Sequence, residues 1–367
     1  MLARTRERNG KVKVEAMSEQ WLSFLDQLGA VAGEEGGVRF DPPERELRAA
    51  LTGDILCELS CRQGLIAVAG ADAAIFLQGQ FTSDVRQVTP ERSQLSAWCN
   101  PQGRMLACFR LFRRGDSYYL RLPLEQVEPV LKRLRLFVLR ARVTLTDASE
   151  TSIPSGLVGP SAVSLLQETL GMAPDQVDAV IQKTDLTVIR APGTPPRFEL
   201  YGGAEAMTGL WTQLAPRVAF AGAEPWRLLD ILAGIPNIYP ATTEAFVPQM
   251  VNLQLLGGVS FRKGCYTGQE VVARTQHLGK LKRRMYRAHV DSAIPPKAGD
   301  MLFSPQADGG QPAGTIVDAC RHPDGGYEIL AVVVIDYAGN GTVMVDGEQG
   351  AKLEFAPLPY ALKGVEI

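Results

Sequence analysis

The sequence predicts an α+β protein with duplicated ferredoxin-like α/β subdomains followed by a small C-terminal β-barrel. Three observations support this prediction. Residues 64–146 read as β-α-β-β-β-α-β, the opening of that pattern returns from residue 156, and only short strands between turns follow residue 279. The expected segments are an N-terminal extension with a helix (1–46), a first subdomain (47–149), a second subdomain (150–280) and the barrel (281–367).

A basic stretch and a helix precede the first subdomain. The first sixteen residues contain Lys and Arg but no apolar core, so they are not a secretory signal and are predicted to be a tail. The sequence leaves open whether Met1 or Met17 is the start. Apolar side chains at helical spacing predict an amphipathic helix over 18–29, and glycines and prolines predict a loop over 29–43.

The first subdomain opens with a short apolar strand that leads into a helix. Asp72 is the expected N-cap of that helix, and Gly115-Asp116 is typical of a hairpin turn between two later strands. The predicted elements are strands over 64–70, 95–99, 105–113, 117–122 and 141–146, and helices over 73–80 and from 123 to about 138.

The second subdomain repeats the opening of the first. At one constant offset, the residues that match are Gly70, Asp72, Ala73, Leu77 and Gln78 with Gly159, Ser161, Ala162, Leu166 and Gln167. An internal duplication explains this spacing, and a chance match over twelve residues is the alternative. Further predicted elements are strands over 185–190, 197–201 and 217–220, and helices over 203–214 and 224–233.

Beyond residue 279 the pattern changes to short strands separated by Gly, Pro and Asp turns. They are predicted over 282–290, 301–304, 314–319, 327–335, 341–345 and 351–355. Even spacing without a helix favours a small β-barrel or sandwich.

Composition limits the classes of function. Apolar residues make up 46% and charged residues 21% of the 367 residues, as in an ordinary globular protein. A net charge of -2 provides no bulk attraction to nucleic acid or to an anionic membrane, and no apolar run has the length of a membrane span. We therefore expect no membrane partner and no direct nucleic-acid binding.

Six cysteines form no CxxC pair and have no His at metal-site spacing. They predict reduced thiols in a cytoplasmic protein without a metal site. Cys57 and Cys61 are spaced like neighbours on a helix and are expected in the core.

One concentrated basic stretch offers an alternative to this picture. It contains Lys280, Lys282, Arg283, Arg284 and Arg287. On a strand, alternate members could meet phosphates, but no aromatic side chains lie between them. A solvated strand edge protected by Lys is the favoured interpretation.

The densest chemistry lies in residues 262–270, which read Arg-Lys-Gly-Cys-Tyr-Thr-Gly-Gln-Glu. Thr267 and Glu270 have the spacing of a capping box, so a helix is predicted to begin at Gly268. Cys265 then lies near the positive end of the helix dipole and close in sequence to Lys263 and Arg262, all of which favour a thiolate. Local physics leaves two interpretations open: a reactive or ligand-binding cysteine, and a tight turn with a buried structural one.

The run 263–270 (KGCYTGQE), continued by Ala273-Arg274, resembles the signature of the YgfZ family of folate-binding proteins, which are relatives of the glycine-cleavage T protein (aminomethyltransferase). The stretches 77–85 (LQGQFTSDV), 100–104 (NPQGR) and 224–236 agree with this resemblance. It extends from about residue 50 to the end of the chain.

The resemblance implies a T-protein-like fold and a tetrahydrofolate-binding accessory protein that supports iron–sulfur cluster assembly or repair. It also implies a link to tRNA modification, with iron–sulfur enzymes such as a radical tRNA methylthiotransferase as partners. Cys265 is the expected functional thiol and Lys263 its electrostatic partner. The expected folate-binding residues are Asn100, Arg104, Glu224, Arg227, Arg262, Gly264, Tyr266 and Gln269. Whether Cys265 relays sulfur, attacks carbon or binds iron stays open.

A folate-dependent one-carbon transferase is the alternative function. In the T protein a carboxylate a few residues after the counterpart of Gly103 acts in methylamine transfer. Here no Asp or Glu occurs between Gly103 and Arg114. Because acid–base work on an aminomethyl group needs such a side chain, the sequence disfavours aminomethyltransferase activity.

Overall fold

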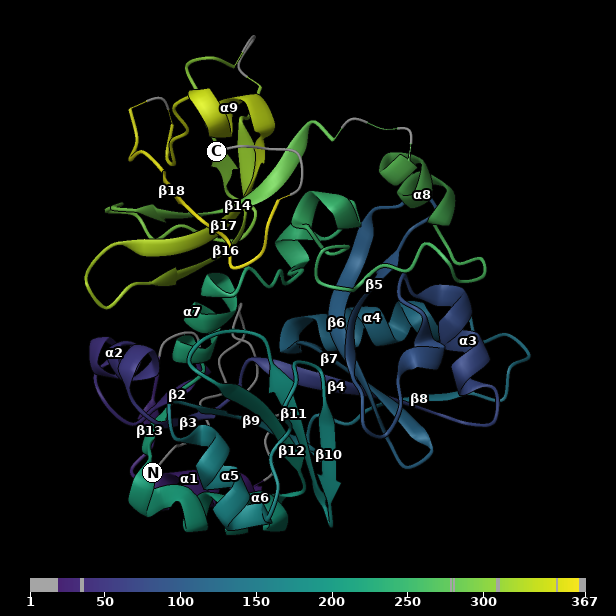
Figure 1. The fold of residues 1–367 in the computed structure, drawn as a ribbon, viewed down its shortest axis with the longest axis vertical. Helices are drawn as coiled ribbons and strands as arrows, with labels where there is room; N and C mark the ends of the chain where they lie inside the picture. Colours follow the sequence, from purple (N-terminus) through teal and green to yellow (C-terminus); the bar gives the residue numbers. More distant parts are fainter. Residues whose placement is uncertain are drawn as a thin grey trace, which may run out of the picture. The chain divides into compact units, whose positions relative to one another are not determined.

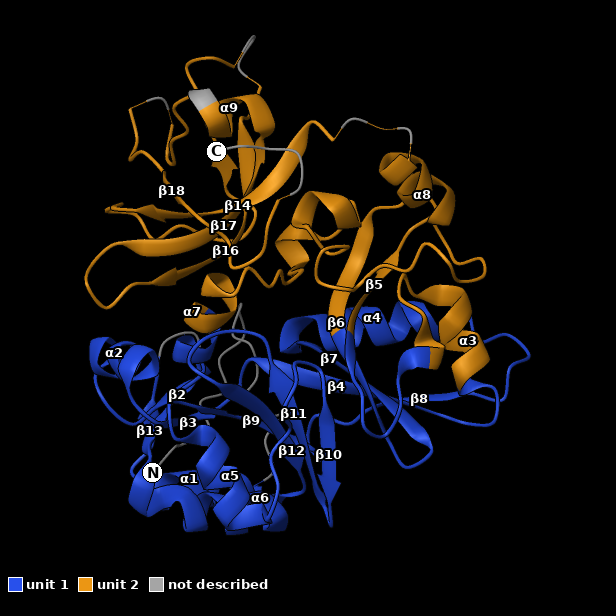
Figure 2. Ribbon diagram, viewed as in Figure 1, with its two compact units in different colours: residues 1–73, 87–94, 110–227 blue, residues 74–86, 95–109, 228–367 orange. Residues whose placement is uncertain are grey.

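The computed structural model describes residues 19–33, 36–277, 279, 281–307, 311–347 and 349–362. The predicted basic tail and the choice between Met1 and Met17 lie outside the described residues. The chain forms two compact units: unit 1, with residues up to 73, 87–94 and 110–227, and unit 2, with residues 74–86, 95–109 and 228 onward (Figure 2). These units do not follow the four predicted segments, whose borders stay a prediction.

Unit 1 contains a six-stranded sheet in the order β10-β11-β12-β9-β3-β13 (Figure 1). The strands are β3 (Ile55–Glu58), β9 (Ile153–Val158), β10 (Val180–Lys183), β11 (Leu186–Ala191), β12 (Arg197–Gly202) and β13 (Ala219–Ala221). Four helices accompany it in the sequence: α1 (Glu19–Gln27), α2 (Pro43–Thr52), α5 (Ala162–Leu170) and α6 (Ala204–Leu214). A two-stranded sheet of β1 (Val31–Ala32) and β2 (Val38–Arg39) lies between α1 and α2 in the chain.

A five-stranded sheet in the order β5-β6-β7-β4-β8 contains the strands of the first predicted repeat. They are β4 (Gln63–Ala69), β5 (Gln94–Cys99), β6 (Met105–Arg114), β7 (Ser117–Pro123) and β8 (Thr144–Asp147), with helices α3 (Ala73–Gln80) and α4 (Leu124–Arg135). When β3 is set aside, this order matches that of the six-stranded sheet strand for strand. The shared topology supports the predicted duplication.

Strand β3 and its neighbourhood differ from the sequence-based expectation. Cys57 lies in this strand and Cys61 in the turn after it, so the predicted helical relation is wrong, although both are buried as expected. Strand β3 pairs antiparallel with β9 and parallel with β13. It therefore lies between two strands of the second repeat, although it precedes the first repeat in the chain. Strand β10 and helix α2 were also not predicted.

Aromatic side chains form part of the unit 1 core. The ring of Phe112 stacks on Tyr119 at a centroid distance of 5.3 Å and on Tyr201 at 4.7 Å, and these rings pack with Leu65 and Ile189. Phe112 and Tyr119 are directly opposite each other on β6 and β7, whereas Tyr201 belongs to β12. Side chains of the two repeats therefore share one core within unit 1.

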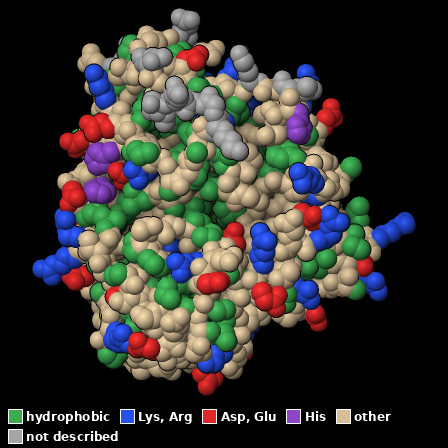
Figure 3. Space-filling model, in the orientation of Figure 1, with side chains coloured by type: hydrophobic (Ala, Val, Ile, Leu, Met, Phe, Trp, Pro, Cys, Tyr) green, Lys and Arg blue, Asp and Glu red, His purple; other side chains and the backbone are tan. Residues whose placement is uncertain are grey.

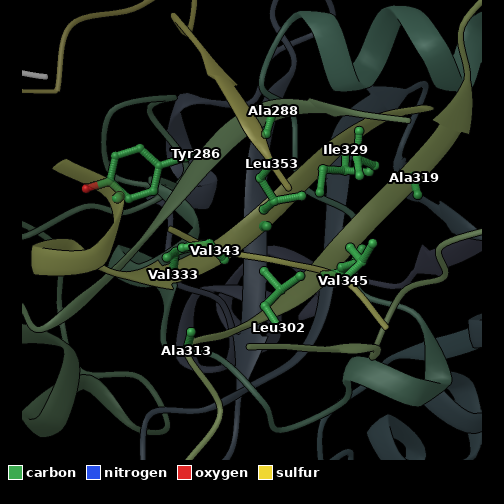
Figure 4. Close-up of a cluster of buried hydrophobic side chains, with 14 residues drawn as sticks. Tyr286, Ala288, Leu302, Ala313, Ala319, Ile329, Val333, Val343, Val345 and Leu353 are labelled. Atoms are coloured by element: carbon green, nitrogen blue, oxygen red, sulfur yellow. The ribbon is translucent and has the colours of Figure 1, made fainter. Parts of the chain in front are cut away.

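The C-terminal part of unit 2 is a five-stranded sheet in the order β15-β16-β17-β14-β18. Its strands are β14 (Arg283–Val290), β15 (Met301–Leu302), β16 (Gly314–Arg321), β17 (Tyr327–Val334) and β18 (Glu354–Ala356). Buried side chains such as Ala288, Ile329 and Val333 pack beneath it with Val343 and Leu353 (Figure 4). Among the described strands, β15 and β18 do not pair directly, and the two edges are linked only by isolated bridges of Met344 to Phe303 and to Lys352, so the predicted closed barrel is not confirmed.

Two other features of this region differ from the prediction. Helix α9 (Ile335–Asn340) directly follows β17, where no helix was predicted. The basic strand β14 pairs with β17 over its whole length, and β18 covers its other side at Arg287–His289, so the predicted strand edge is covered at Arg287 but not by β18 at Arg283 and Arg284.

The described residues contain no helix that is long and apolar enough to cross a membrane. On the face in Figure 3, cationic and anionic side chains are intermingled, in keeping with a net charge of -2.

Candidate functional site

Three of the stretches that carry the resemblance meet within unit 2. They are the end of α3 with the residues that follow it (77–85), the turn 100–104, and the segment 262–270 that leads into helix α8 (Gln269–His277). Residues far apart in the sequence are thus joined through Lys263 and Gly268, the residues on either side of Cys265 in the signature segment.

Lys263 joins the signature segment to the end of α3. Its side chain is buried, at 7% exposure, and Nζ donates hydrogen bonds to the carbonyl oxygens of Gln78 (2.8 Å), Phe81 (2.6 Å) and Ser83 (2.8 Å). Burial lowers the pKa of Lys263 to about 8, and the charge of Asp84 opposes that change. The amine therefore keeps its three protons at neutral pH, one for each carbonyl. The ring of Tyr266, centred 5.0 Å from Nζ, covers the cation.

Asp84 supplies a fixed negative charge next to this contact. Its carboxylate accepts hydrogen bonds from Gln78 Nε2 (3.0 Å), Arg86 Nε (2.9 Å) and Arg86 Nη2 (2.7 Å). The bonds from Arg86 lower the pKa of Asp84 to about 2. At neutral pH this group is ionised and engaged, so it is not a proton donor.

Glycines allow the turn 100–104 and the start of α8 to meet backbone to backbone. Gly268 has φ +83°, and a Cβ added there would lie 2.4 Å from the carbonyl oxygen of Asn100. Gly103 has φ +71°, and a Cβ there would lie 2.9 Å from Cβ of Val271. Packing against a neighbouring turn thus requires glycine at 268.

Replacing Gly268 by alanine is expected to destabilise the protein by about 2–4 kcal/mol, because the left-handed backbone is strained and the added methyl group overlaps Asn100. Urea unfolding measures this change. Gly264→Ala is the matched control: no atom lies within 4 Å of a Cβ at 264 and its φ is not left-handed, so a change within about 0.5 kcal/mol is expected. Equal unfolding midpoints for the two variants would contradict the close packing at Gly268.

Cys265 is the one exposed thiol among the six cysteines, all of which lie within the described residues. Burial raises the pKa of Cys57, Cys61 and Cys99 and keeps these thiols protonated. Arg262 is also exposed, whereas the Lys263 ammonium is directed to the three carbonyls. The described residues contain no group of three or more His, Cys, Asp or Glu side chains arranged to hold a metal ion.

The remaining predicted residues of unit 2 are mostly engaged with the backbone. Asn100 Oδ1 accepts a hydrogen bond from the backbone N–H of Arg104 (3.0 Å), and Arg104 Nη1 donates to the carbonyl of Ala245 (2.8 Å). The N–H of Gln269 donates to the carbonyl of Tyr266 (3.2 Å), and burial raises the pKa of Tyr266. These groups shape the segment around Cys265.

The start of α8 differs from the prediction. The helix begins at Gln269, one residue later than expected. Within the described structure, neither Thr267 nor Glu270 makes a side-chain hydrogen bond to the first turn, so the capping box is not formed. The hydrogen bond from Gln249 Nε2 to the carbonyl of Val272 (2.7 Å) instead ties the helix to the 3₁₀ helix Pro248–Val251.

Glu224 and Arg227 belong to unit 1, at the start of α7 (Glu224–Leu232). Glu224 pairs with Arg62 at 3.1 Å and with Arg227 at 3.8 Å. Their predicted part in folate binding stays a prediction.

Unit 1 contains a buried ionic cluster that sequence analysis missed. Arg110 and Arg121 are directly opposite each other on β6 and β7, and both bond Glu199 Oε1, at 3.2 and 2.6 Å. Arg110 also pairs with Asp178, and Tyr201 donates to Glu199 Oε2 at 2.5 Å. Burial alone would raise the pKa of Glu199, but the charges of Arg121 and Arg110 lower it to about 2. An arginine within the apolar run of β6 was the signal available in the sequence.

The chain is similar in sequence to a known domain family and to known proteins. The GCVT N-terminal domain family matches residues 12–194. The chain is 33% identical to the tRNA-modifying protein YgfZ of Colwellia psychrerythraea over 78% of this chain and 88% of that protein. It is 32% identical to the YgfZ protein of Yersinia pestis over 81% and 90% of the two chains.

The fold is similar to that of the glycine cleavage system aminomethyltransferase T from Bartonella henselae. The TM-score is 0.72 at 18% identity, and the match covers 93% of this chain and 96% of the other. This likeness confirms the predicted T-protein-like fold. Together with the identity and coverage of the YgfZ proteins, it shows that the chain belongs to the family of the tRNA-modifying protein YgfZ.

Proposed function

We propose that this protein is a tetrahydrofolate-binding accessory protein that supports iron–sulfur cluster assembly or repair, and thereby tRNA modification. Cys265 is its working thiol. The observation that carries the proposal is the exposure of Cys265 alone among six cysteines, on a segment held to two other parts of unit 2 by Lys263 and Gly268. An exposed thiol on a fixed backbone suits transfer or transient ligation of sulfur, carbon or iron.

The side chains near this segment fit the chemistry of a folate. A pterin needs paired donors and acceptors in an apolar slot, and its glutamate tail needs a cation. Gln80 Oε1 is a buried acceptor that has no hydrogen-bond partner within the described structure, and Arg262 and Arg104 are exposed cations. Asn100, Tyr266, Gln269 and Gly264 are proposed to line the slot, and Arg104 and Arg262 to pair with carboxylates, all within unit 2. Bound tetrahydrofolate would supply a carrier for one-carbon units.

At two positions unit 2 lacks a carboxyl group suited to acid–base work, which favours an accessory role over a one-carbon transferase. None follows Gly103 on β6, and Asp84 is ionised and held by Arg86. Neither position provides the acid–base group that transfer of an aminomethyl group needs. Assays with aminomethyl or methylated amine donors and tetrahydrofolate are expected to give no product, and product formation would establish the enzyme alternative.

Tetrahydrofolate at 100 times its dissociation constant is expected to stabilise the protein by about 2.7 kcal/mol, because ligand binding to the folded state alone shifts unfolding by mass action. Thermal unfolding with and without the ligand measures this. Arg262→Ala is expected to weaken binding about tenfold through the loss of a carboxylate partner, whereas Arg113→Ala, which removes a half-buried cation of unit 1, leaves it unchanged. No shift for the wild type at millimolar ligand would contradict folate binding.

A further inference from the structure

The segment that ends helix α4 and follows it displays apolar side chains to solvent. Leu136 is 72% exposed, Leu139 89% and Phe137 41%. Single exposed apolar residues are ordinary, but three within four positions form a patch. We propose that the surface of residues 132–142, here called the α4 patch, docks a protein partner whose own surface is acidic around an apolar hollow.

Charge supports an acidic partner. The α4 patch contains no carboxylate and five cations, of which Arg142 pairs with Asp72 from outside the patch: Lys132, Arg133, Arg135, Arg140 and Arg142. The chain as a whole has a net charge of -2, so this local excess is not a consequence of a basic composition. Complementary charge at an interface mainly raises the rate and the specificity of association.

The backbone of the patch is fixed. Successive turns are closed by hydrogen bonds from the N–H groups of Phe137 and Ala141 to the carbonyls of Leu134 (3.1 Å) and Val138 (2.8 Å). Arg142 is held by Asp72, which accepts from its backbone N–H at 2.8 Å and from Nη2 at 3.1 Å. Binding of a partner here therefore costs little conformational entropy, because the loop is already ordered.

Leu139 combines strain with exposure. Its φ is 44°, in the left-handed region, which costs a residue with a side chain about 1–2 kcal/mol relative to the usual backbone. Glycine would remove that cost, and at 89% exposure the leucine gains almost no burial in return. Burial of this side chain against a partner would explain both the strained backbone and the exposed leucine.

The exposed leucines distinguish a protein from other anionic partners. Phosphates of RNA would engage the arginines but leave the leucines without a role. A membrane surface suits an amphipathic helix with one broad apolar face, whereas this patch is a series of turns after a helix that exposes Glu125 and Glu128. Protein interfaces, by contrast, are enriched in arginine and aromatic residues around an apolar centre.

The choice of partner rests on the proposed function: the client is an iron–sulfur enzyme, and the probe is purified tRNA methylthiotransferase. It is titrated with full-length wild type and variants by calorimetry at low and at physiological salt. Leu139→Gly and Arg140→Glu are each expected to weaken binding at least tenfold. Glycine suits the backbone at 139, so the first variant keeps the fold. Ile294→Ser, which removes an apolar side chain that is 60% exposed in unit 2, should bind as the wild type does.

Equal affinity of all variants, or no binding of the enzyme by the wild type, would overturn the docking proposal. So would binding of tRNA or of phosphatidylglycerol vesicles that depends on Arg140 but not on Leu139. Rescue of tRNA modification in a deletion strain is measured separately. Rescue without docking would support the proposed function and contradict the docking surface. Docking that depends on Leu139 without rescue would support the docking surface and contradict the proposed function.

Discussion

Replacing Lys263 by methionine is expected to destabilise the protein by about 3–5 kcal/mol. Methionine keeps the apolar stem but removes the three protons that Nζ donates to the carbonyls of Gln78, Phe81 and Ser83. Buried carbonyls that lose their donors cost about 1–3 kcal/mol each, less what relaxation and water recover. The measurement is the free energy of unfolding from urea titration.

Arg262→Met is the matched control for this variant. The neighbouring Arg262 is exposed, so loss of its charge is expected to change the unfolding free energy by less than about 0.5 kcal/mol. If Lys263→Met were as stable as this control, the three carbonyl contacts would not hold the segment, and a role for Lys263 at the thiol would become the better explanation.

Glu199→Gln is expected to destabilise the protein by about 3–5 kcal/mol through unit 1. Glu199 lies between Arg110 and Arg121, two buried cations directly opposite each other on neighbouring strands. A neutral amide leaves the pair with the Asp178 carboxylate alone, and uncompensated buried charge is costly. Chemical denaturation at pH 7 measures the loss, and Glu205→Gln on helix α6 is an exposed control.

The same cluster predicts a loss of stability in acid. The folded-state pKa of Glu199 is about 2, below its ordinary value of 4.5, so the unfolded state binds the proton more readily. The carboxylate therefore contributes its full stability above about pH 4.5 and loses it as the pH falls toward 2. Glu199→Gln should show a smaller decline over this window than the wild type, and parallel declines would contradict the assignment.

Local signals in the sequence predicted much of the fold. Helix α3 has the predicted bounds, 73–80, and β4, β5, β6 and β7 lie within one residue of theirs. These elements have periodic apolar residues and Gly or Asp at their ends. Their positions are therefore determined by residues that are close together in the sequence. Strand β3 is only four residues long and pairs with β9 and β13, so its place depends on contacts distant in sequence.

The sequence could predict which residues belong to the candidate site, but not their exposure or their contacts. The signature pointed to Cys265, and the sequence could not show that it is the exposed cysteine. Lys263 was assigned to the thiol because it lies two residues away in the chain, whereas its three acceptors are more than 170 residues earlier. Leu139 offered no signal at all, since neither its φ nor its exposure can be read from the residue type.

The central claim is that Cys265 is the working group of a protein that maintains tRNA modification. It is tested most directly by the level of methylthiolated adenosine in tRNA from a deletion strain that carries either the wild type or Cys265→Ala. Because the side chain is exposed, the variant should fold as the wild type does. Restoration of the modified base by the wild type alone is the predicted result. Equal restoration by both proteins would contradict the claim and make Cys265 dispensable.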